Sequence, residues 1–415
     1  MLYPMVDYSA LDLMLDPLEL NEFVGPCAGE IQVAASRLTN MPSGATVELV
    51  GHPQDLTERF RGFGGQPNYG RLVRALPVRG RGNRGEQLHG AGVCTNRHTD
   101  QDGTPRRQIT LMPSWLVSAG HSPTTYTVAC LVHGLDIRWR WGSPLATRGW
   151  LLEAKKSEGH SQEGAPCSWV IASRAGGRRV SISDAERHMH DVLSCLSLGL
   201  GYQVSAGPIL FLGRNGQPLN RIRLIAPSDQ VDRALHFGWL HDSYPQEAIK
   251  AALDFAVEVL AQWRPADAAF GIAGAASYLV RASHAPVLDW QARDLIIALE
   301  RLVKKHTGPA GGDIRLKLER LEVATGLGHV TAAEREWLRR FRNRLSHEGT
   351  LSEPGATSVR QLHQSVGWLR SFVLRHAMAC LGWQHGQIRD FGSVPHKMRP
   401  VSGRKFAKPS YVPPA

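Results

Sequence analysis

The sequence has few cysteines, and their spacing matches neither a disulfide framework nor a zinc site. Six cysteines are scattered through 415 residues, and no two of them form a C-x-x-C pair. They are Cys27, Cys94, Cys130, Cys167, Cys195 and Cys380. This pattern argues against a small disulfide-stapled scaffold and against a four-thiolate zinc site.

The chain also lacks long apolar segments. No uncharged apolar run is long enough to span a bilayer, and no basic stretch followed by an apolar core stands at the N-terminus. We therefore expect a reduced, cytoplasmic protein that makes no use of a membrane.

Acidic residues are outnumbered by basic ones. The 48 Lys and Arg residues exceed the 37 Asp and Glu residues, which gives a formal net charge of +11. Part of the excess lies in the Pro-rich tail after Gly386, where six cations face only Asp390 for a local net of +5. An excess of this size predicts a polyanionic partner.

The front half of the chain has the short runs of β-branched and aromatic residues that are typical of strands. These runs cover Thr46–Val50, Gln108–Met112, Thr125–Val132, Trp150–Ala154 and Trp169–Ser173. A helix follows, with Ser183 to Glu186 as its capping box. The Asn215-Gly216 pair then predicts a hairpin turn.

One Gly- and Arg-rich stretch interrupts this pattern. Residues 79–107 contain few apolar side chains and are expected to form a mobile loop. Gly80 to Gly85 match G-x-G-x-x-G by letter, but neither a strand before them nor a helix after them is expected, so a dinucleotide fold is not predicted.

After Pro227 the pattern becomes helical, with apolar residues three and four apart. Stripes begin at Ile249, Leu295, Leu316 and Val359, and a small-residue helix is expected near Ala268 to Leu279. The expected architecture is α+β and multidomain: a β-rich domain at 1–226, an all-α helical bundle at 227–385 and a basic, disordered tail at 386–415.

The helix that ends at His347 is the most informative segment. Its expected boundaries are a capping box at Thr331 to Glu334 and a terminal Gly349. On a helical wheel that starts at Arg339, Arg342, Asn343, Ser346 and His347 fall between about −60° and +80°. Trp337, Leu338, Phe341 and Leu345 fall on the opposite arc, between about 160° and 260°. The polar residues should therefore face a ligand or partner while the apolar residues pack.

Arg342-Asn343-Arg344-Leu345-Ser346-His347 resembles the R-N-x-x-x-H signature of HEPN-domain ribonucleases. The resemblance covers the helical stretch from Pro245 to His385. The order of a β-rich front half and a C-terminal helical bundle is also similar to that of the ApeA-like anti-phage proteins.

The resemblance implies a metal-independent endoribonuclease site that two protomers form across a dimer interface. His347 would be the acid/base group, Arg342 would hold the phosphate, and Asn343 would orient them. Arg339, Arg340 and Ser346 would contact RNA, and Arg340 is also an allowed alternative to Arg342 by spacing. The implied products are a 2′,3′-cyclic phosphate and a 5′-hydroxyl, with no metal or other cofactor.

The implied partners are RNA, a second copy of the chain and a phage-derived trigger at the front domain. A metal site at His89, Cys94, His98 and Asp100 is not expected, because their spacing is irregular. Glu300 could orient His347. A carboxylate in such a position is more commonly exposed to solvent as a partner of a cation such as Arg301 or Lys304. Solvent exposure is also expected for His363 and His376.

Two other functions are open. The bundle could be a non-catalytic HEPN module that binds RNA or serves as a scaffold, or the chain could be a DNA-binding regulator that uses its basic tail. Replacing His347 or deleting the tail would separate the three hypotheses.

Overall fold

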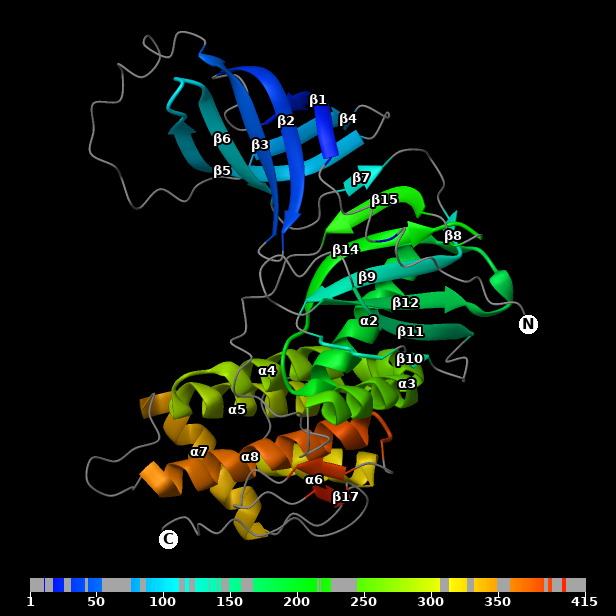
Figure 1. The fold of residues 1–415 in the computed structure, drawn as a ribbon. Coiled ribbons are helices and arrows are strands. Elements are labelled where there is room, and N and C mark those ends of the chain that lie inside the picture. Colours follow the sequence, from blue (N-terminus) through cyan, green and yellow to red (C-terminus); the bar gives the residue numbers. More distant parts are fainter. Residues whose placement is uncertain are drawn as a thin grey trace. The chain divides into compact units, whose positions relative to one another are not determined.

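The structure is a computed structural model with an α+β fold (Figure 1). It describes residues 11, 18–25, 31–41, 44–53, 76–82, 87–111, 116–118, 124–133, 135–139, 141–142, 149–157, 167–214, 216, 218–224, 245–306, 313–326, 332–348, 359–383, 387–389 and 398–400. The chain forms two compact units. Met1–Met189 and Ser205–Gln230 make the first, and His190–Val204 and Val231–Ala415 make the second.

Six antiparallel strands of the first unit close into a barrel. They are β1 (Leu18–Val24), β2 (Ile31–Met41), β3 (Gly44–Pro53), β4 (Leu76–Gly82), β5 (Gln87–Thr99) and β6 (Pro105–Leu111). The pairing order is β5-β4-β1-β2-β3-β6, and β6 pairs back with β5. Alternate side chains point inward, so Val47, Leu49, Leu88 and Ile109 are fully buried.

The prediction of a mobile loop over residues 79–107 was wrong. Most of this stretch belongs to β4, β5 and β6, which pair with one another in register. A small barrel needs apolar side chains only at alternate positions, such as Leu88, so low apolar content does not exclude a strand. Gly92 has a steric role, because a Cβ there would lie 2.7 Å from Ile109 Cγ2.

Seven further strands of the first unit form an antiparallel sheet that continues from β5. In order they are β7 (Leu116–Ser118), β15 (Pro218–Leu224), β14 (Ser205–Leu212), β9 (Thr127–His133), β12 (Cys167–Arg174), β11 (Trp150–Lys156) and β10 (Trp141–Gly142). β9 is buried along its whole length. The five predicted strands and the β14–β15 hairpin are confirmed, and Gly216 has a φ of 75° in its turn.

Three shorter elements precede the helix α2 (Ile182–Leu200) in the chain. They are β8 (Thr124–Thr125), β13 (Val180–Ser181) and the 3-10 helix η2 (Ala175–Gly177), and two of them, β8 and β13, pair with each other. The backbone N–H of Asp184 donates to Ser181 Oγ at 3.0 Å. The helix is therefore capped at Ser181, two residues before the predicted cap at Ser183, because Ser181 has the same N-capping chemistry with an acidic residue three positions later.

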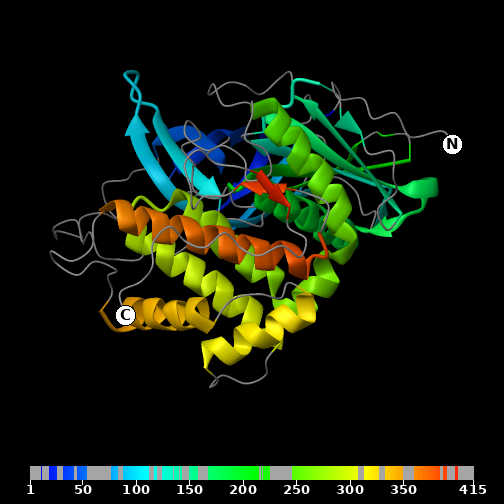
Figure 2. The ribbon, with the colours of Figure 1, turned by 90° about the horizontal axis from the view of Figure 1, so that it is seen from below.

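Six helices of the second unit form a bundle, which Figures 1 and 2 show from two directions. They are α3 (Pro245–Phe270), α4 (Ile272–His284), α5 (Leu288–His306), α6 (Ile314–Thr325), α7 (Ala332–Glu348) and α8 (Val359–Cys380). α5 lies at the centre and contacts α3, α4, α6, α7 and α8. The expected small-residue helix is divided at Gly271, whose φ of 73° ends α3 and starts α4.

The basic tail was predicted to be disordered, but two short segments of it pair. β16 (Gln387–Arg389) and β17 (Met398–Pro400) form a two-stranded antiparallel sheet. The prediction was based on the composition of the tail, which could not provide an apolar core. Backbone pairing of this kind does not depend on such a core. None of the described helices combines the length and the apolar character needed to cross a bilayer.

Candidate functional site

α7 places its apolar arc in the bundle, as the helical wheel predicted. Trp337 and Leu338 are buried, and Phe341 and Leu345 are half-buried. The Trp337 ring lies 4.6 Å from that of Phe341 and packs edge-on against Trp368 of α8 at 4.9 Å. These contacts fix the rotation of α7 about its own axis.

The opposite arc of α7 carries the predicted site residues. Ser346 and His347 are exposed, and Arg342 and Asn343 are half-buried. His347 is in the last turn of the helix. The predicted ends at Thr331 and Gly349 lie outside the described residues. The described part of α7 therefore tests the predicted polar arc but not the predicted caps.

Arg342 is bound from a neighbouring helix. Its Nε donates to Glu300 Oε1 of α5 at 2.7 Å, and its Nη1 lies 3.5 Å from Asn343 Oδ1. Both side chains of the ion pair stay accessible, at 42% for Arg342 and 40% for Glu300. Glu300 therefore reaches the polar face and pairs there with Arg342. This partner is neither His347, which the sequence left open, nor Arg301 or Lys304, the commoner expectation.

This difference has a geometric cause. The guanidinium of Arg342 is long and carries a permanent charge, so it reaches the Glu300 carboxylate from a position five residues before His347 in α7. Only one of its three nitrogens is bound to Glu300. The two terminal nitrogens of a guanidinium are the ones that bind a phosphate bidentately.

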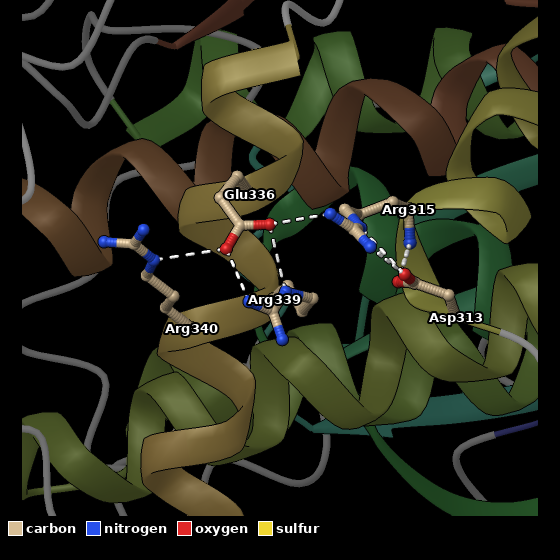
Figure 3. A network of polar contacts seen from close by, with 5 residues as sticks. All are labelled: Asp313, Arg315, Glu336, Arg339 and Arg340. Carbon is tan, nitrogen blue, oxygen red and sulfur yellow. Dashed lines mark hydrogen bonds and ion pairs between the residues drawn. The ribbon is translucent and has the colours of Figure 1, made fainter. Parts of the chain in front are cut away.

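Arg339 and Arg340, the predicted RNA contacts, share a carboxylate in the first half of the helix. Figure 3 shows Glu336 between Arg339 at 2.6 Å, Arg340 at 3.1 Å and Arg315 of α6 at 2.9 Å. Arg315 also pairs with Asp313, which caps α6. Hydrogen bonds from Arg339 and then Arg340 lower the pKa of Glu336 to about 2.

The sequence analysis missed Glu336. The signal was present, because Glu336 stands three and four positions before Arg339 and Arg340, the spacing at which helical side chains meet. The partner Arg315 could not be found in this way, because it comes from another helix. As a result, Arg339 and Arg340 present less free positive charge than the wheel alone suggested.

A buried polar cluster fixes the same half of α7 to its neighbours. Arg335 Nη2 donates to Glu322 Oε2 of α6 at 2.7 Å, and Glu322 is 2% exposed. His376 of α8 lies 3.8 Å from Glu322 Oε1, and its Nδ1 is 2.8 Å from the Phe372 carbonyl oxygen. The expected exposure of His376 was wrong, because its ring fills the core beside Phe372 at 4.3 Å.

Within the described part of the chain, no group of three His, Cys, Asp or Glu side chains could hold a metal ion. His89 lies 3.5 Å from Gln87 Oε1, and His98 is 3.6 Å from Asp100. The side chain of Cys94, the other member of the set considered in the sequence, is outside the described residues.

Comparisons with protein-family models, with curated proteins and with solved structures find no match to this chain.

Proposed function

We propose that α7 carries the active site of a metal-independent endoribonuclease of the HEPN type. The observation that supports this best is the arrangement of Arg342, Asn343 and His347 on one accessible face of a helix whose other face is packed. The arginine is pre-positioned by Glu300, and the imidazole is accessible to a substrate.

The chemistry requires three groups. A base removes the proton of the ribose 2′-hydroxyl, an acid protonates the leaving 5′-oxygen, and a cation stabilises the charge on the phosphorus oxygens. His347 serves as acid or base, because an imidazole exchanges protons near neutral pH. Arg342 binds the phosphate through the nitrogens that Glu300 does not occupy.

A single protomer supplies one such histidine from α7. We therefore propose a homodimer in which the motif helices of two protomers face each other, so that one His347 acts as the base and the other as the acid. Arg339, Arg340 and Ser346 would flank the RNA. Displacing Glu300 from Arg342 costs little, since an ion pair this exposed contributes only about 0–1 kcal/mol.

We further propose that the protein is a cytoplasmic anti-phage effector that causes abortive infection, with the β-rich unit as the sensor of a phage-derived trigger. This part of the proposal follows from the similarity of layout to the ApeA-like proteins. It predicts that expression of the triggered protein stops growth and fragments cellular RNA.

The test replaces His347 and Arg342 singly with alanine and follows growth arrest and RNA fragmentation in cells. Both variants should lose both effects, while the matched control His363→Ala, an exposed histidine on α8, should keep them. If His347→Ala remains toxic, the non-catalytic RNA-binding module is favoured. If only deletion of residues 386–415 removes function, the DNA-binding regulator is favoured.

A further inference from the structure

The outer face of α5 is made of three cations and an indole. Within the described part of this helix, the residues classed as exposed are Trp290, Arg293, Arg301 and Lys304. On a helical wheel that starts at Trp290, they fall between about −60° and +20°. They therefore form one continuous strip along the helix, which we call the α5 strip.

The cations of the α5 strip have no acidic partner among the residues that the structure describes. The two carboxylates that border the strip are bound elsewhere, since Asp294 pairs with Arg281 of α4 and Glu300 pairs with Arg342. Asp289 lies further round the helix, at about −100° on the same wheel. Cations that share one helix face repel one another, so a polyanion that binds along the strip is attracted by all of them and relieves this repulsion.

Trp290 gives the strip a surface for stacking. The residue is 58% exposed, whereas Trp337, Trp368 and Trp383 of the same bundle are buried. Val287, one turn earlier, is 43% exposed and extends the apolar surface beside the ring. Unpaired nucleobases stack on exposed aromatic rings of this kind, which is a main source of affinity for single strands. A base inside a duplex is already stacked on its neighbours, so the indole favours a single-stranded partner.

A second aromatic ring positions one of the cations. Arg301 Cζ lies 5.9 Å from the ring centre of Tyr278 in α4, and Arg281 lies over the same ring at 4.4 Å. Arg281 Nε also donates to Asp294 at 2.7 Å, so the charge of Arg281 is compensated. The contact of Arg301 with the ring restricts its side chain without cancelling its charge. Arg301 is therefore oriented and still able to bind an anion.

The α5 strip runs beside the proposed active site. Glu300 falls at about −80° on the same wheel, at the edge of the strip, and its carboxylate accepts from Arg342 Nε at 2.7 Å. Along the helix axis, Trp290 is about 15 Å from Glu300, and Lys304 is one turn beyond Glu300. An RNA chain with one phosphate on Arg342 can therefore continue along α5 toward Trp290.

We propose that the α5 strip binds single-stranded RNA and leads it to Arg342 and His347. A base stacks on Trp290, and the three cations bind phosphates of the backbone. The inference rests on the proposed nuclease function for the identity of the ligand, and it adds that the substrate is unpaired beside the cleaved phosphate. Because stacking and phosphate contacts read no base edge, the strip selects single strands without selecting a sequence.

The experiment measures the binding of a fluorescent single-stranded RNA to the full-length His347→Ala protein, by anisotropy at several salt concentrations. Adding Trp290→Ala should weaken binding at least about fivefold and leave the salt dependence unchanged, because stacking is not an ionic contact. Adding Arg293→Gln and Lys304→Gln together should make the slope of log affinity against log salt shallower by about 1.4, since each phosphate contact to a single strand contributes about 0.7. A duplex of the same sequence should lose less affinity with Trp290→Ala.

The matched control is the pair Lys250→Gln and Arg320→Gln, which removes the same charge from exposed positions of α3 and α6 and should leave the slope close to its starting value. Equal losses in the control and in the α5 pair, or unchanged binding in both α5 variants, overturn the proposal. So does a loss of self-association by Trp290→Ala with RNA binding unchanged, which assigns the indole to a second copy of the chain.

The same proteins with His347 restored are assayed for RNA cleavage, which separates this proposal from the nuclease. Wild-type protein that binds RNA through the α5 strip but does not cleave it supports the strip and refutes the nuclease. Wild-type protein that cleaves RNA, while both α5 variants bind RNA as tightly as it does, supports the nuclease and refutes the strip.

Discussion

At the scale of single residues, the ion pair between Arg342 and Glu300 determines how readily the guanidinium can bind a phosphate. The pair is 2.7 Å long, and both members are about 40% exposed. Because water screens a pair of this exposure, the carboxylate orients Arg342 without holding it strongly. The terminal nitrogens are then available to an incoming phosphodiester.

Arg342→Lys tests this role. Lysine keeps the charge but lacks the planar fork of donors, so we expect the rate of RNA cleavage to fall about 10²-fold while the fold is retained. Arg340→Lys is the matched control, since Arg340 lies at the edge of the polar arc and should change the rate less than about threefold. A wild-type rate for Arg342→Lys would contradict the assigned role.

Glu336 gives a prediction on stability and pH. Its folded pKa of about 2 lies below the ordinary value of 4.5, because Arg339, Arg340 and Arg315 favour the ionised form. The stabilisation is therefore complete above about pH 4.5 and is lost as the pH falls toward about 2. Thermal unfolding of the wild type and Glu336→Gln should show a difference in melting temperature at pH 7 that narrows below pH 4.5.

The control for that experiment is Glu319→Gln, which removes an exposed carboxylate that lies 3.7 Å from Arg335. It should lower the melting temperature at pH 7 by less than Glu336→Gln does. Equal melting temperatures for the wild type and Glu336→Gln at pH 7 would show that the network of Figure 3 does not stabilise α7.

At the scale of the secondary-structure elements, α7 is held by its buried arc and by the Arg335–Glu322 contact. Leu338 is fully buried in this arc. Leu338→Ala should lower the free energy of unfolding by about 2–5 kcal/mol through lost burial and a cavity. Ser346→Ala, on the exposed arc of the same helix, should change it by less than about 0.5 kcal/mol. Denaturant unfolding of both variants checks the prediction, and similar losses would mean that the two arcs are wrongly assigned.

The sequence predicted those elements best whose own periodicity is strong. The β-branched and aromatic runs of the central strands and the apolar stripe of α7 depend on neighbours in the chain, so they could be recognised locally. The strands β4 and β5 could not, because closure of the barrel and the fit of Gly92 against Ile109 are set by residues far apart in sequence.

The candidate site also has one part that the sequence predicted and another that depends on tertiary packing. The direction in which Arg342, Asn343 and His347 point followed from helical geometry alone. Their partners did not, because Glu300 of α5 and Arg315 of α6 reach α7 through tertiary packing. The burial of His376 against Phe372 and Glu322 was missed for the same reason.

At the scale of the whole molecule, the proposed mechanism requires two copies of the motif helix. An excess of His347→Ala protein should therefore suppress the RNA cleavage of wild-type protein, because mixed dimers lack one of the two imidazoles. An equal excess of His363→Ala protein, which keeps the motif intact, should not suppress cleavage. Activity of the wild type that is unaffected by the His347→Ala protein would mean that one protomer suffices.

The central claim is tested most directly by the chemistry of the RNA ends that the purified protein makes in EDTA. The proposed mechanism predicts 2′,3′-cyclic phosphate and 5′-hydroxyl ends from the wild-type protein and from His363→Ala, and no cleavage by His347→Ala. Products with 5′-phosphate ends, cleavage that EDTA abolishes, or undiminished cutting by His347→Ala would contradict it.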